Sequence, residues 1–81
     1  MLNLPHALIS ILTLIPSRVR NTELVIEILG ALINILFYIS CDIIGQYKKE
    51  IVDIIIPLIN HSDLRVRNDA LNVLINACSD L

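Results

Sequence analysis

The fold of this chain is decided by residues 55–74, which read IIPLINHSDLRVRNDALNVL. An apolar run leads into the polar segment 60–63, and beyond it Val66, Ala70 and Leu74 recur at steps of four. Apolar side chains at that spacing lie on one face of an α-helix. The stretch therefore predicts two helices joined by a tight turn, with Leu58, Val66, Ala70 and Leu74 buried between them.

Two further features of this stretch mark where its helices end and begin. Pro57 lacks an amide hydrogen, so we expect a kink or an early end late in the first helix. Ser62 or Asp63 can accept hydrogen bonds from the open amides of the second helix and so cap it.

Four helices account for the whole chain. We predict them over Leu4–Ile15, Asn21–Ser40, Tyr47–Asn60 and Leu64–Ser79. Pro16 disfavours helix in the residue before it, Asn21 can cap the second helix, and segment 41–46 is expected to be a joint. Ile and Val are abundant, but no stretch alternates apolar and polar residues as a half-buried strand does. The expected class is all-α.

Composition raises the question of what covers the apolar surface. The 81 residues are 56% hydrophobic and only 4% aromatic. A domain of this size buries only about 60–65% of its unfolded surface, so some aliphatic side chains must meet more of the same protein, another subunit or lipid. Open apolar faces also predict self-association of the isolated chain.

Charge argues against a nucleic-acid partner. The formal net charge is −2, and the six Lys and Arg are scattered apart from Lys48 and Lys49. No basic stripe is available to follow a phosphate backbone. Nucleic acid is therefore not expected as a partner.

Membrane association is the alternative interpretation of so apolar a chain. The uncharged run 28–41 is shorter than the roughly 18–20 residues that span a bilayer, and it contains Asn34. The run 7–15 resembles the apolar part of a signal peptide, but no Lys or Arg precedes it. A membrane partner is thus not expected, although a small membrane-associated helical protein stays the alternative to a binding module.

Cys41 and Cys78 are interpreted as free small hydrophobes, with a disulfide between them as the alternative. Two cysteines form no framework that implies secretion. We expect an intracellular location in the cytoplasm, with the nucleus as the alternative.

Internal repetition supports stacked helical pairs. Asn34-Ile35-Leu36 matches Asn72-Val73-Leu74 at a spacing of 38, and Leu32-Ile33-Asn34 matches Leu74-Ile75-Asn76 at 42. Segment 18–21 recurs as 65–68, at a spacing of 47. Periods in this range are typical of helical-pair repeats, although the register stays open.

Residues 55–74 resemble a HEAT repeat, in which an apolar helix containing Pro leads through a short acidic turn to Val-Arg, Ala and Leu at helical spacing. Armadillo repeats are similar, and their Leu-x-Asn is matched at 74–76 and 32–34. The resemblance implies an α-solenoid of stacked antiparallel helical pairs with about two repeats. It places the first at about 4–42 and the second at about 43–80, in a fragment of a longer solenoid. The function that it implies is a protein-interaction scaffold.

Catalysis has no support in the spacing of reactive residues. His6 and His61 are far apart, no Cys-x-x-Cys or His-x-x-x-His occurs, and the acidic residues are mostly isolated. His61, Ser62 and Asp63 are of the types found in catalytic triads, but three consecutive residues of one turn do not readily adopt triad geometry. We expect no enzyme, no catalytic residue, no metal and no cofactor.

One polar row suggests a binding site. Asn68, Asn72 and Asn76 follow at steps of four on the fourth helix, and Arg65 and Ser79 extend the row. The plainer interpretation is the solvated face of an amphipathic helix. The resemblance to armadillo proteins implies that Asn76 and Asn34 line a groove and bond the backbone of an extended peptide, so the partner is expected on the second and fourth helices.

Overall fold

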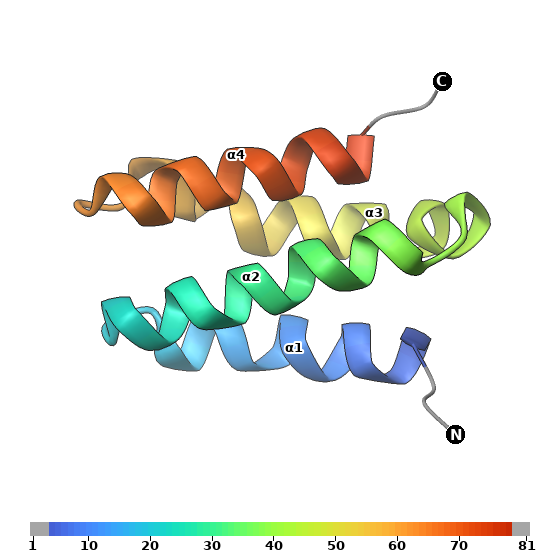
Figure 1. Ribbon diagram of the computed structural model, residues 1–81, viewed down its shortest axis with the longest axis horizontal. Coiled ribbons are helices and arrows are strands. Elements are labelled where there is room, and N and C mark those ends of the chain that lie inside the picture. Colours follow the sequence, from blue (N-terminus) through green and yellow to red (C-terminus); the bar gives the residue numbers. More distant parts are fainter. Residues whose placement is uncertain (1–3, 79–81) are drawn as a thin grey trace.

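A computed structural model describes residues 4–78, and within that range all regular secondary structure is helical (Figure 1). The elements are α1 (Leu4–Arg18), α2 (Thr22–Tyr38), α3 (Cys41–Ile55), the 3-10 helix η1 (Ile56–Asn60) and α4 (Leu64–Cys78). The expected all-α class is confirmed. No helix among these residues is long and apolar enough to cross a membrane.

The helices form two antiparallel pairs that lie side by side. α1 pairs with α2, and α3 with its η1 extension pairs with α4. α2 and α4 run in the same direction and make the most extensive contact between helices, while α1 meets α3 behind them (Figure 1). One layer is thus made of α2 and α4, and the other of α1 and α3.

The helix starts are fixed by side-chain caps. The Asn21 side chain accepts a hydrogen bond from the Leu24 amide at 3.2 Å, as predicted. Asp63 Oδ1 accepts from the Arg65 amide at 2.8 Å, which confirms the expected cap of α4. Caps of this kind satisfy amides that have no partner inside the helix.

The expected joint at 41–46 is wrong. These residues are the first part of α3, because the Ser40 side chain accepts from the Ile43 amide at 3.4 Å and so begins the helix at Cys41. The turn between α2 and α3 shrinks to Ile39 and Ser40, and α3 begins two residues before the expected start of the second repeat.

The two prolines act differently. The α-helical part of the third helix ends at Ile55, and Pro57 lies in the first turn of η1, as expected of a residue without an amide hydrogen. Pro16, in contrast, lies inside the last turn of α1, which continues to Arg18 instead of ending at Ile15. The missing amide removes one helical bond, to the Leu12 carbonyl, and the burial of Leu12 and Ile15 in the core favours the helical turn despite that loss.

The core runs through all four helices. Its buried side chains are Leu8, Leu12, Ile15, Val25, Leu29, Leu32, Leu36, Ile39, Ile44, Ile51, Ile55, Leu58, Val66, Ala70, Val73 and Ala77. Leu58, Val66 and Ala70 are buried as predicted, but Leu74 is only half-buried. Steps of four overrun the 3.6-residue turn, so the buried stripe moves to Val73 and Ala77.

The buried positions recur between the two pairs. Val25, Leu29, Leu32 and Leu36 of α2 correspond to Val66, Ala70, Val73 and Ala77 of α4, each 41 residues on. Leu8, Leu12 and Ile15 of α1 correspond to Ile51, Ile55 and Leu58, each 43 residues on. The sequence matches have spacings of 38, 42 and 47 residues. Only the spacing of 42 lies within one residue of the 41 and 43 that separate the buried positions.

Candidate partner-binding face

The predicted asparagines lie on the layer formed by α2 and α4. Asn68 and Asn72 are exposed on α4, Asn34 is exposed on α2, and Asn76 is half-buried near the end of α4. Ser79, to which the row was expected to extend, lies outside the described residues. Asn68 and Asn72 lie on the opposite side of α4 from its buried stripe.

Large apolar side chains accompany the asparagines. Phe37 and Tyr38, at the end of α2, are 76% and 79% exposed, and their ring centroids lie 6.3 Å apart. Leu64, Leu71 and Ile75 follow at steps of seven and four on α4, and Ile75 is 65% exposed. Most of the large exposed apolar residues among 4–78 therefore belong to α2 and α4. Sequence reasoning missed these residues because aromatic and aliphatic side chains in an apolar helix are usually core.

A pocket lies where α2, α3 and α4 meet. Its volume is about 310 Å³, and its lining combines Phe37 and Ile39 with Cys41, Lys48 and Asn76. Asn76 thus differs from the other asparagines, because its side chain belongs to the wall of a hollow and not to an open surface. The pocket can accept one apolar side chain with a polar atom near Asn76.

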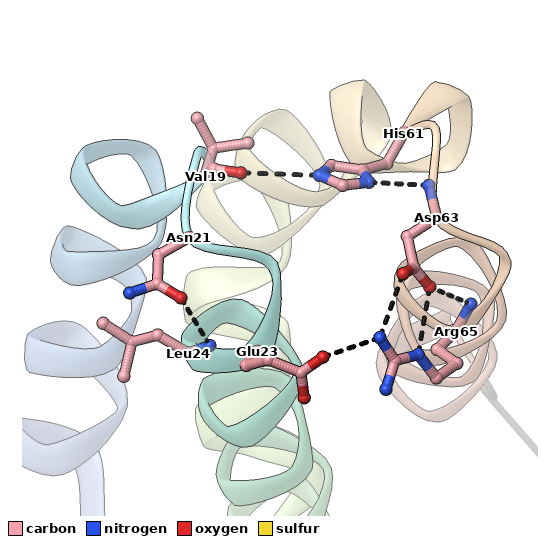
Figure 2. A network of polar contacts seen from close by, with 7 residues as sticks. All are labelled: Val19, Asn21, Glu23, Leu24, His61, Asp63 and Arg65. Carbon is pink, nitrogen blue, oxygen red and sulfur yellow. Dashed lines mark hydrogen bonds and ion pairs between the residues drawn. The ribbon is translucent and has the colours of Figure 1, made fainter.

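Arg65 is engaged at the other end of this face (Figure 2). Its Nη2 donates to Glu23 Oε1 on α2 at 2.8 Å and to Asp63 Oδ2 at 3.1 Å, and its Nε donates to Asp63 Oδ1 at 3.2 Å. These bonds lower the pKa of Asp63 below its ordinary value, the side-chain hydrogen bond being the largest cause. The same bonds raise the pKa of Arg65. Arg65 is 58% exposed, but its observed contacts join α2 to α4 within the chain.

His61 makes a second link between the pairs (Figure 2). The Asp63 amide donates to His61 Nδ1 at 3.0 Å, so in the neutral ring Nε2 carries the hydrogen, and it lies 3.4 Å from the Val19 carbonyl oxygen. Arg67 Nη1 donates to the His61 carbonyl at 3.1 Å. The residues of this turn hold the two pairs together and have no arrangement of nucleophile, base and orienting group.

Among residues 4–78, no group of three or more His, Cys, Asp or Glu is placed to hold a metal ion. Cys41 and Cys78 are free, as predicted, and the alternative of a disulfide between them is wrong. Both are exposed. Each lies at a helix end.

The sequence matches no protein-family model, and comparisons with curated proteins and with solved structures give no significant match. A role for this face must therefore be argued from its own side chains.

Proposed function

We propose that this chain is a segment of an α-solenoid of the HEAT/armadillo kind, and that it binds a protein or peptide partner along α2 and α4. The stacking of two antiparallel pairs, with buried positions that recur at 41 and 43 residues, supports the repeat assignment. The links from His61 to Val19 and from Arg65 to Glu23 both join residues 42 apart, as equivalent contacts between neighbouring repeats would.

The observation that carries the binding proposal is the exposure of Phe37 and Tyr38 beside a pocket walled by Asn76. Aromatic side chains are enriched at the centres of protein interfaces, where they supply much of the binding energy. Exposed rings of this size next to a hollow are costly in water unless a partner covers them.

The asparagines suit a partner that presents its backbone. A peptide backbone offers one donor and one acceptor at most residues, and an amide side chain can satisfy both kinds. Asn34, Asn68 and Asn72 are exposed on the same layer as the aromatic pair, so they can hold an extended segment whose apolar side chain enters the pocket.

A displayed library of random peptides can test this proposal. Peptides are selected on the immobilised chain, and the affinity of the selected peptides is then measured. Asn76→Ala should weaken binding by about 1–3 kcal/mol, because it leaves a peptide group unpaired, while the thermal midpoint changes little. Lys49→Ala, at an exposed position of α3, is the matched control and should bind as the wild type does.

Two results would contradict the proposal. Asn76→Ala could unfold the chain, or leave the affinity unchanged while substitution of Asp53 or Lys49, which lie on α3 away from the pocket, abolishes it. In the second case the binding surface would lie on the layer of α1 and α3.

A further inference from the structure

The layer formed by α1 and α3 carries a groove of its own, away from the asparagines. Two open hollows follow the line between these helices, with volumes of about 250 and 330 Å³. Ile54 contributes to both, so the hollows adjoin. We propose that this α1–α3 groove binds an amphipathic helix of a partner protein that carries Lys or Arg beside its apolar face.

The lining of the groove is apolar in both hollows. Ile9, Leu12 and Tyr47 line the first, and Ile15, Pro16, Val19, Pro57 and Leu58 line the second. Ile9 is 43% exposed, so apolar surface stays open to water here. Two adjoining apolar hollows fit two apolar side chains spaced by a turn of helix.

The charges at the rim of the groove indicate which polar groups a bound helix should carry. Thr13 donates its hydroxyl hydrogen to the Ile9 carbonyl at 2.8 Å, so this donor needs no acceptor from a partner. Glu50 and Asp53 lie at the rim, one in each hollow, and within residues 4–78 neither side chain makes an ion pair or a hydrogen bond. Carboxylates accept hydrogen bonds and cannot donate them when ionised. Both carboxylates are exposed and negatively charged, so an occupant with a cation beside its apolar face complements them best.

Among residues 4–78, no Lys or Arg forms an ion pair with Glu50 or Asp53. Lys49 is the neighbour of Glu50, and adjacent residues point about 100° apart around a helix. Lys48 lines the pocket between α2, α3 and α4 instead. The groove thus presents two negative charges beside an apolar floor.

A helix fits this floor better than an extended peptide does. The walls are helices whose interior backbone groups bond within themselves, so they offer no ladder to a strand. An extended backbone laid over apolar side chains would lose its bonds to water without replacement, whereas a helix brings its own bonds satisfied. The α2–α4 layer, with its amide side chains, has the opposite preference.

Isoleucine methyl NMR on the full chain can test the proposal with one defined probe. The probe is a short helical peptide with leucines on one face and lysines flanking them. On titration, the methyl signals of Ile9 and Ile54 should shift, and those of Ile33 and Ile75 on the other layer should not. Fluorescence anisotropy should show that Glu50→Gln combined with Asp53→Asn weakens the binding about tenfold.

The matched control removes two negative charges from the α2–α4 layer instead. Glu27→Gln with Asp69→Asn should leave the affinity for the lysine peptide unchanged, and a peptide with glutamates in place of the lysines should bind at least about tenfold more weakly. Equal loss in both double variants would overturn the proposal, because the attraction would then be nonspecific. Shifts confined to Ile33 and Ile75 would overturn it as well, while leaving the α2–α4 proposal intact.

Discussion

His61 and Val19 are 42 residues apart in the chain, and His61 Nε2 lies 3.4 Å from the Val19 carbonyl oxygen. The bond joins the turn before α4 to the turn before α2, at the end of the molecule where Arg65 also meets Glu23. Two helical pairs that touch mainly through apolar side chains could slide along each other. Directional bonds between equivalent turns oppose that sliding.

Replacement of His61 by Ala should therefore destabilise the fold by about 1 kcal/mol, the usual net effect of losing a partly buried hydrogen bond. Urea unfolding followed by circular dichroism measures the change. Ser62→Ala, at the exposed neighbouring position, is the control and should shift the free energy of unfolding by less than about 0.5 kcal/mol. Equal effects of the two substitutions would mean that the link to Val19 contributes nothing.

Asp63 should make the stability depend on pH in the acid range. Its pKa in the folded chain is lower than usual because Arg65 donates to it. The unfolded chain therefore takes up the proton first as the pH falls, and the stability that the carboxylate contributes decreases with it. This contribution is present in full above the ordinary Asp pKa of about 3.9 and is lost as the pH falls through the lower folded value.

The variant Asp63→Asn separates the charge from the cap, since Asn is also a good capping residue. The wild type should exceed the variant in free energy of unfolding near neutral pH, and the difference should shrink below about pH 4. A difference that stays constant from neutral to acid pH would assign the role of Asp63 to the cap alone.

Leu32 and Leu74 provide a comparison within the core. Leu32 is fully buried in α2, and Leu74 is half-buried at the edge of α4. Leu32→Ala should cost about 2–5 kcal/mol, the range for a packed leucine. Leu74→Ala should cost about half as much, because less apolar surface returns to water. Urea titrations of both variants measure this, and equal costs would place Leu74 in the core, as the four-residue spacing predicts.

The two glycines offer a stabilising substitution. Gly30 lies in α2 and Gly45 in α3, neither has positive φ, and a Cβ at either position meets no atom within 4 Å. Ala at each should raise the free energy of unfolding by about 0.4–1 kcal/mol, since the unfolded chain loses freedom. Thermal unfolding checks both. Gly45 lines the pocket and Gly30 does not, so a loss of partner binding in Gly45→Ala alone would indicate that the partner reaches the pocket floor.

Local capping chemistry made much of the fold predictable. Asn21, Asp63 and Pro57 mark helix boundaries that the structure confirms, because each acts through its own backbone neighbourhood. Residues 41–46 were less informative, since Gly45 resembles a helix breaker while Ser40 already caps a helix that runs through it. Whether the helix begins after Ser40 or beyond Gly45 depends on how α3 packs.

The candidate site was harder to predict, because exposure depends on the tertiary arrangement. The asparagine row follows from the steps of four, and Asn68 and Asn72 are exposed accordingly. Phe37 and Tyr38 could not be assigned to the surface from sequence, since the sequence of an apolar helix does not show which of its turns are covered by other helices. The α1–α3 groove depends on two helices that are distant in sequence, so periodicity alone does not reveal it.

Exposed apolar side chains on α2 and α4 should also make the isolated chain self-associate. Phe37 and Ile75 are 76% and 65% exposed on this layer. Because both are largely outside the core, Phe37→Ser with Ile75→Ser should change the free energy of unfolding little while removing apolar surface that drives association. Sedimentation velocity at high micromolar concentration should show oligomers for the wild type and fewer for the double variant. Ile9→Ser is the control on α1, and it should leave the oligomers in place. If Ile9→Ser removes the oligomers instead, two copies meet through the α1–α3 groove. A strictly monomeric wild type would contradict the prediction, because the exposed apolar side chains would then not be enough to drive self-association.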